Sequence, residues 1–96
     1  MGPLVSSHET ADAQVTTSPT RLYGVVVGVT AADVANKIEL KDGTTSGTVL
    51  FTVDIGHLSL GPVVVNFPSG TYIRFGTKMY LDVYGAVDAV TLMYQT

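Results

Sequence analysis

The sequence has no cysteine and no tryptophan, and only 14% of its 96 residues are charged. Without cysteine the chain forms neither disulfides nor thiolate metal sites. Basic runs are also missing, and five Lys and Arg stand against eight Asp and Glu, so we expect no nucleic-acid partner. The longest apolar stretch, residues 25–29, is interrupted by Gly28 and is far too short for a membrane span.

The first 15 residues contain neither the basic region nor the continuous apolar region of a signal peptide. We therefore expect a soluble protein that has no membrane partner and is not exported by the general secretory route. A chain of 96 residues has room for one core, which predicts a single domain.

The share of charged residues is roughly half that of an ordinary soluble domain, while 46% of the residues are hydrophobic. That is more apolar surface than one small core needs. The composition favours a surface that other subunits cover in part. A solvated surface rich in Thr, Ser and Gly is the alternative.

Alternating apolar and polar residues predict seven or eight short strands, and no window is long enough for a crossover helix. The clearest element is the hairpin at 37–54, which turns at Asp42-Gly43. The other predicted strands are residues 11–17, 21–29, 62–67, 71–75, 78–84 and 87–95. This pattern predicts an all-β fold, an antiparallel β-sandwich. Eight strands would suit a jelly roll and seven an immunoglobulin-like sandwich, and both stay open.

Residues 1–20 contain few bulky side chains and are interrupted by Pro3 and Pro19, so we interpret them as an extended N-terminal arm. Residues 21–96 form the predicted β-sandwich domain. Within the arm, 11–17 would pair as an edge strand wherever an edge is available. A disordered tail is the alternative to a tether that orders on a neighbour.

Two strands predict which side chains enter the core. In 87–95 the inward residues are expected to be Val90, Leu92 and Tyr94, and the alternative inward set is Ala89, Thr91 and Met93. In 21–29, alternation groups Tyr23 with the valines at 25, 27 and 29, and places Leu22, Val26 and the glycines at 24 and 28 on the other face. Both faces of this strand are expected to be buried. Those glycines predict a closely approaching neighbour or a β-bulge.

Reactive groups are few. The histidines are His8, in the arm, and His57, in a loop, and neither has a nucleophile or carboxylate pattern beside it. Asp42-Gly43 resembles the start of a calcium loop, but Thr44 and Ser46 stand where further acidic ligands belong. We therefore expect no enzymatic activity, no metal and no cofactor.

Tyr72, Tyr80 and Tyr84 alternate away from the predicted core. Such tyrosines suit either a sugar platform or a protein interface, and the interface is favoured because no cluster of Asn, Asp and Trp accompanies them. Lys37, Glu39 and Lys41 form the most charged strand face and are expected to face water instead. The predicted contacts with other subunits or with a partner protein are Leu4, Val5, Val15, Tyr72, Tyr80 and Tyr84.

Four segments carry a family resemblance: RLYGVVV at 21–27, ELKDGTTSGTVLFTV at 39–53, NFPSGTYIRFGTKMYLDVYG at 66–85 and VTLMYQ at 90–95. Together they resemble small β-sandwich virion structural proteins of tailed bacteriophages, notably of cyanophages and other marine phages. The resemblance implies a capsid cement or decoration protein that binds the major capsid protein as a homotrimer. It would stabilise the shell from the outer surface of the virion and be assembled in the host cytoplasm. The alternative is a head-fibre or tail-associated β-module that binds carbohydrate or another virion protein.

Overall fold

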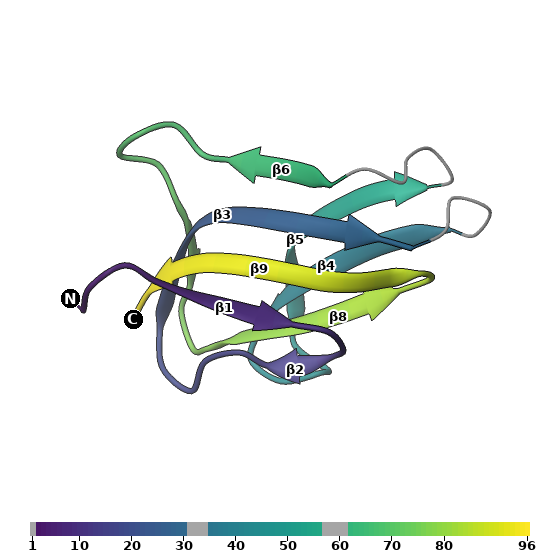
Figure 1. The fold of residues 1–96 in the computed structure, drawn as a ribbon. Helices are drawn as coiled ribbons and strands as arrows, with labels where there is room; N and C mark the ends of the chain where they lie inside the picture. Colours follow the sequence, from purple (N-terminus) through teal and green to yellow (C-terminus); the bar gives the residue numbers. More distant parts are fainter. Residues whose placement is uncertain (1, 31–34, 57–61) are drawn as a thin grey trace.

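The computed structural model describes residues 2–30, 35–56 and 62–96, and in them the chain is all β. Strands are arranged in two antiparallel sheets, which Figure 1 shows as layers of a sandwich. Sheet A has the order β1 (Val5–Glu9), β9 (Val87–Gln95), β3 (Thr20–Val29) and β6 (Val63–Asn66), and β7 (Ile73–Phe75) also pairs with β3. Sheet B has the order β2 (Ala13–Gln14), β8 (Met79–Tyr84), β4 (Asn36–Asp42) and β5 (Thr48–Gly56).

The strand order is that of a jelly roll. Strands β6 and β7 share one position, because β6 pairs with residues 24–27 of β3 and β7 with residues 20–22 of the same strand. With that position counted once, the first strand pairs with the last, the second with the last but one, and so on to the β4–β5 hairpin. The chain is thus a long hairpin rolled into two sheets, and the jelly roll, not the immunoglobulin-like alternative, is the fold.

The N-terminal segment belongs to the sandwich. Strand β1 pairs along the edge of β9, and β2 pairs with β8 in the other sheet. Thr16 fixes the connection from β2 to β3: its hydroxyl oxygen accepts a hydrogen bond from the Met79 backbone N–H at 2.9 Å and lies 2.7 Å from the Thr20 hydroxyl. The expected strand at 11–17 is shorter, Ala13–Gln14, and residues 5–9 add a strand that alternation in the sequence does not predict.

Between the sheets lies one apolar core, whose largest fully buried side chains are Phe75, Leu22, Ile38, Leu40, Met79, Leu81 and Leu92. The inward positions expected in β9 are confirmed, since Val90 and Leu92 are fully buried and Tyr94 packs against the core. The expectation for Tyr23 is wrong. A bulge between Leu22 and Gly24 puts Leu22 on the side of Val25, and Tyr23 on the outer side.

The hairpin predicted at 37–54 is confirmed as β4 and β5. Asp42 does more than turn the chain. Its carboxylate accepts hydrogen bonds from the backbone N–H groups of Gly76, Thr77 and Lys78, at 3.2, 2.9 and 3.4 Å. Asp42 therefore ties the β4–β5 turn to the connection between β7 and β8. His57, which was expected in a loop, lies within 57–61, outside the described residues.

Candidate functional site

The outward side chains of sheet A form rows that run across the strands, and we call the surface made by three of these rows face A. The register gives the rows His8, Thr91, Val26 and Val64; Ser6, Met93, Gly24 and Asn66; and Gln95, Arg21 and Arg74. None of these residues is acidic, and the two arginines alone are formally charged at pH 7. Face A is therefore formally uncharged in its middle and positive at one end.

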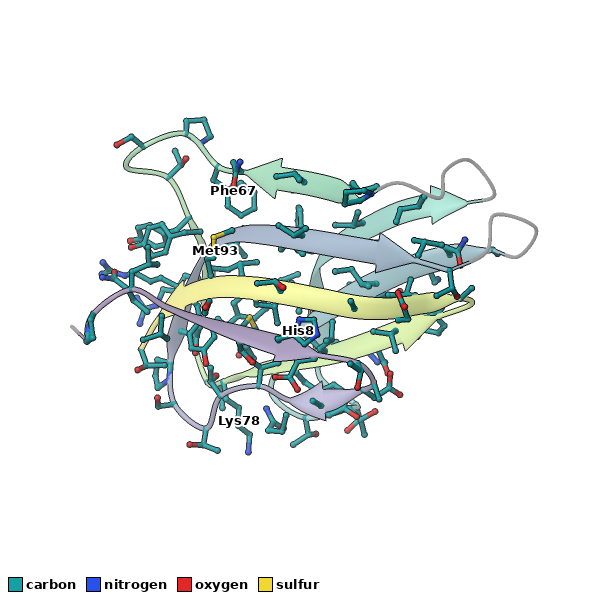
Figure 2. The ribbon with its side chains drawn as sticks, viewed as in Figure 1. His8, Phe67, Lys78 and Met93 are labelled. Carbon is teal, nitrogen blue, oxygen red and sulfur yellow. The ribbon has the colours of Figure 1, made fainter. Side chains whose placement is uncertain are left out.

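The middle of face A is apolar and low in relief. Val64 is 57% exposed, and Val26 beside it is half-buried. Met93 lies over Gly24, because a Cβ at that glycine would come within 2.6 Å of the Met93 Cε methyl. Figure 2 shows Met93 and His8 on this side of the sandwich. A surface without projecting charged side chains can approach another protein closely.

The positive end of face A is organised by aromatic rings. The Arg21 guanidinium lies 4.6 Å from the centre of the Tyr72 ring, and that ring lies 5.7 Å from the Tyr23 ring. The Tyr23 hydroxyl in turn donates a 2.9 Å hydrogen bond to Gln95 Oε1. These contacts restrain Arg21 and orient Gln95, and the amide nitrogen of Gln95 stays available as a donor.

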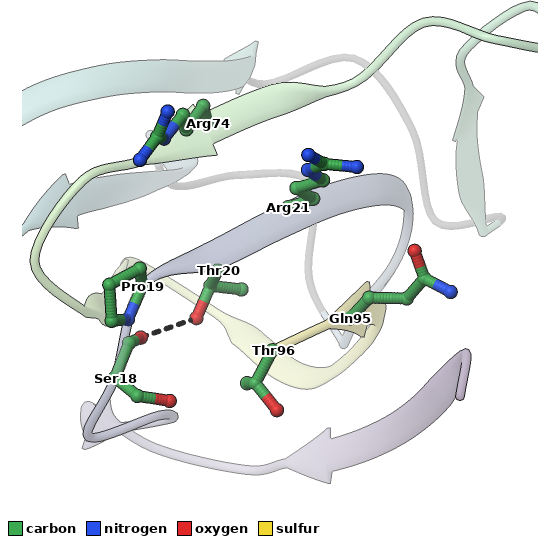
Figure 3. A pocket seen from close by; sticks show the side chains of 7 residues that line it. All are labelled: Ser18, Pro19, Thr20, Arg21, Arg74, Gln95 and Thr96. Carbon is green, nitrogen blue, oxygen red and sulfur yellow. Dashed lines mark hydrogen bonds between the residues drawn. The ribbon is translucent and has the colours of Figure 1, made fainter. Parts of the chain in front are cut away.

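Beside this end lies a cavity of about 310 Å³. It is lined by Ser18, Pro19, Thr20, Arg21, Arg74, Gln95 and Thr96 (Figure 3). Arg21 and Arg74 are direct partners on neighbouring strands. The salt bridges among the described residues are made by Lys37 and Lys41, so neither arginine has a carboxylate partner there.

The outward side chains of β4 and β8 in sheet B form face B, where charge is neutralised internally. The pairs across the two strands are Lys37 with Tyr84, Glu39 with Asp82, and Lys41 with Tyr80. Lys41 Nζ lies 2.5 Å from Asp82 Oδ2, and Lys37 Nζ lies 3.6 Å from Glu39 Oε2. The Tyr84 hydroxyl donates to Glu39 at 2.9 Å and lies 3.5 Å from Asp82.

Two pKa values on face B are shifted by this network. The hydrogen bond to Asp82 raises the pKa of Lys41 above its ordinary 10.5, against a smaller opposing effect of burial. The hydrogen bond to Glu39, then burial and the nearby acidic charges, raise the pKa of Tyr84 above its ordinary 10.0. Both groups therefore keep their protons at neutral pH, and neither is poised for proton transfer.

The apolar contact residues predicted in the N-terminal segment lie in different surroundings. Leu4 is 57% exposed and lies beside Tyr23 and Gln95 at the positive end of face A. Val5 is exposed at the edge of sheet A, opposite the inward residue Tyr94. Val15 packs against the core.

The predicted tyrosines do not lie on one surface. Tyr72 lies beside Arg21 in sheet A, whereas Tyr80 and Tyr84 are on β8 in sheet B. A platform of all three is therefore excluded. The charged face of the hairpin was expected to face water, apart from the contact tyrosines. This expectation is also wrong, because Tyr84 pairs with Lys37 and its ring lies 4.7 Å from the Lys37 ammonium.

Other candidate groups are isolated. The exposed His8 ring lies 3.3 Å from the Thr91 hydroxyl. Over residues 2–30, 35–56 and 62–96, no three His, Asp or Glu side chains are placed to hold a metal ion. The same residues include no helix that could cross a membrane.

Four residues of face A were not predicted from the sequence: Arg21, Arg74, Gln95 and Val64. Each stands in a separate predicted strand, and only the register of β3 with β6, β7 and β9 brings them onto one face. The signal that could have identified Arg74 is the alternation in residues 71–75, which places Arg74 on the face opposite that of Phe75. Comparison of the chain with protein-family models, curated proteins and solved structures finds no match.

Proposed function

We propose that this protein is a capsid cement or decoration protein of a tailed bacteriophage. In this proposal it binds the major capsid protein on the outer surface of the head as a homotrimer and stabilises the shell without catalysing a reaction. The observation that carries the proposal is face A, a surface without acidic side chains that combines apolar residues in its middle with two arginines at one end. Jelly rolls occur in viral capsid proteins and also in lectins, so the fold alone favours neither and the surface must decide.

Face A has the features of a protein contact surface. Val64 is exposed on β6, and the exposed Leu4 lies beside Tyr23, whose ring contacts that of Tyr72. Tyrosine with arginine is typical of energetically important contacts. A cement protein needs modest contacts repeated over a lattice, because simultaneous binding at several identical sites multiplies weak affinities. Face B is less suitable, since its charged groups already bind one another.

The proposal is tested by adding purified protein to phage heads that lack it and measuring bound copies per head and head survival on heating. We expect saturation at hundreds of copies, with heads that survive higher temperatures. Saturation at about a dozen copies would instead indicate a vertex or tail position. No binding to heads, with a monomer in sedimentation at micromolar concentration, would overturn the proposal.

A head-fibre or tail module that binds carbohydrate is the second candidate, and the Tyr23–Tyr72 pair favours it. Tyr72 is 40% exposed, and a flat ring beside hydrogen-bond donors suits the apolar face of a sugar. Glycan-array binding that is lost in Tyr72→Ala and kept in Tyr80→Ala, without affinity for heads, would support this candidate over the cement role. Tyr80 is the matched control because it lies on sheet B.

A further inference from the structure

Like charges lie opposite each other on both faces, but only one face neutralises them. On face B, Glu39 is opposite Asp82, and Lys37, Lys41 and the Tyr84 hydroxyl neutralise the pair. Like charges directly opposite on neighbouring strands are destabilising. On face A, Arg21 is opposite Arg74, and neither forms a salt bridge with the described residues.

The groups around these arginines are mainly hydrogen-bond donors. Gln95, Arg21 and Arg74 occupy one row across β9, β3 and β7, and Ser18 and Thr96 contribute hydroxyls to the same cavity (Figure 3). No Asp or Glu side chain lines it. Arg21 is restrained by the Tyr72 ring and Gln95 by the Tyr23 hydroxyl. Part of the entropy cost of binding an anion is therefore already met.

We propose that Arg21 and Arg74 form an anion site that binds a carboxylate side chain of the partner protein. This inference rests on the proposed function, because it names the chemistry of the shell surface that face A meets: an Asp or Glu beside an apolar patch. Planar guanidinium groups bind carboxylates through two parallel hydrogen bonds. A cavity of about 310 Å³ accepts one such side chain, with the Gln95 amide as a third donor.

Charge complementarity supports a protein carboxylate as the occupant. The chain has a formal charge of −3, so its acidic residues repel an anionic surface in general, and binding depends on this local positive end. The chain's own last residue, Thr96, lines the cavity without an ion pair to either arginine. Its backbone oxygen instead accepts a hydrogen bond from the Gly2 N–H.

The site is tested without heads by NMR titration with a triglutamate peptide, with trilysine and with a sulfated oligosaccharide as the comparison probes. Ionic strength is held at about 0.1 M, where charges more than about 10 Å apart are largely screened. We expect triglutamate alone to shift the resonances of Arg21, Arg74, Tyr72 and Gln95. Arg74→Gln should weaken binding about tenfold, as expected for the loss of one charged hydrogen-bond partner.

Lys78→Gln is the matched control, because it removes the same charge from a side chain that does not line the cavity and projects away from the sandwich (Figure 2). Equal weakening in Lys78→Gln and Arg74→Gln would overturn the site, since bulk charge would then explain binding. Binding of the sulfated oligosaccharide in place of triglutamate would overturn the protein carboxylate as occupant.

Head binding by the same variants separates this inference from the proposed function. If wild-type protein binds heads and Arg74→Gln binds equally well, the cement role stands and the anion site is wrong. If triglutamate binds at the arginines but wild-type protein ignores heads, the anion site stands and the cement role is wrong.

Discussion

Face A and face B each carry two like charges that lie opposite each other on neighbouring strands. Only on face B are these charges neutralised by other side chains of the chain. Face B surrounds Glu39 and Asp82 with two lysines and a tyrosine hydroxyl. On face A, Arg21 and Arg74 are opposite each other on neighbouring strands. Among the described residues, the one hydrogen bond, ion pair or ring contact to either guanidinium is that of Arg21 with the Tyr72 ring. A neutralised network stabilises the fold, whereas an unneutralised pair is a surface on which a partner supplies the missing charge.

The two faces also differ in how far charged side chains cover their apolar residues. On face A, Val26, Val64 and Met93 lie between the strands' polar residues without long charged side chains over them. On face B, the Lys37 ammonium lies over the Tyr84 ring. Charged side chains that cover aromatic surface reduce the area available to a partner. Face B therefore carries the internal charge network, and face A is the surface that we propose as the contact with a partner.

The largest expected effect is on the stability of the sandwich that carries both faces. Gly85, between β8 of sheet B and β9 of sheet A, has φ +75°, and a Cβ there would lie 2.2 Å from the Ala35 carbonyl oxygen. Gly85→Ala should lower the free energy of unfolding by about 3 kcal/mol or more, because backbone strain and overpacking add. Urea unfolding followed by circular dichroism measures it.

Gly70→Ala is the control, since Gly70 has φ +85° but open space around its Cβ position. Its expected cost is the backbone term alone, about 1 kcal/mol. Equal losses in the two variants would show that the Gly85 crossover is not tightly packed.

Inward-facing residues could be predicted from the sequence because burial of one strand face enforces an alternation of apolar and polar residues. Val90 and Leu92 followed from period-two spacing, and the hairpin from Asp42-Gly43. Tyr23 did not follow, because the bulge at Gly24 shifts the alternation by one residue, and only the pairing with β9 determines where a bulge falls.

Jelly-roll topology depended on residues 5–9, VSSHE, which have little apolar alternation. They form a strand because β9 offers an edge, and a tertiary cause of this kind is not visible in local sequence. For the same reason the Arg21–Arg74 pair was not predicted. It depends on β3 pairing with β7, half a chain apart.

Val64→Glu distinguishes the faces by binding. A charge on the apolar middle of face A would be desolvated in a complex, so affinity for heads should fall at least about tenfold. Stability should change by no more than about 0.5 kcal/mol, because Val64 is already 57% exposed. Val49→Glu is the matched control: this exposed valine is on sheet B, opposite Lys41, and its replacement should leave head binding intact. Equal loss in both variants would remove the distinction between the faces.

Alkaline pH should weaken face B alone. Because folding raises the pKa of Lys41, this group stabilises the fold fully below pH 10.5, and its contribution is lost as pH rises through the folded-state pKa. The pKa of Tyr84 is also raised, so its contribution is complete below its ordinary pKa of 10.0 and is lost in the same direction. Urea unfolding between pH 8 and 12 should therefore show a decline above about pH 10 that is shallower in Tyr84→Phe and in Lys41→Gln. A decline of unchanged steepness in both variants would show that the network does not stabilise the fold.

The smallest expected effect is the change in the free energy of unfolding when one positive charge is removed, and its sign is opposite on the two faces. Arg74→Gln removes one of two like charges that lie opposite each other and should raise the free energy of unfolding by about 0.3 kcal/mol, a gain that salt should abolish. Lys41→Gln should lower stability, because Asp82 then loses its partner and remains opposite Glu39. Thermal unfolding at low and high salt measures both. A destabilised Arg74→Gln would mean that the arginine already has a stabilising role within the chain. A stabilised variant that binds triglutamate and heads less well would show that the chain retains a strained charge pair for its partner.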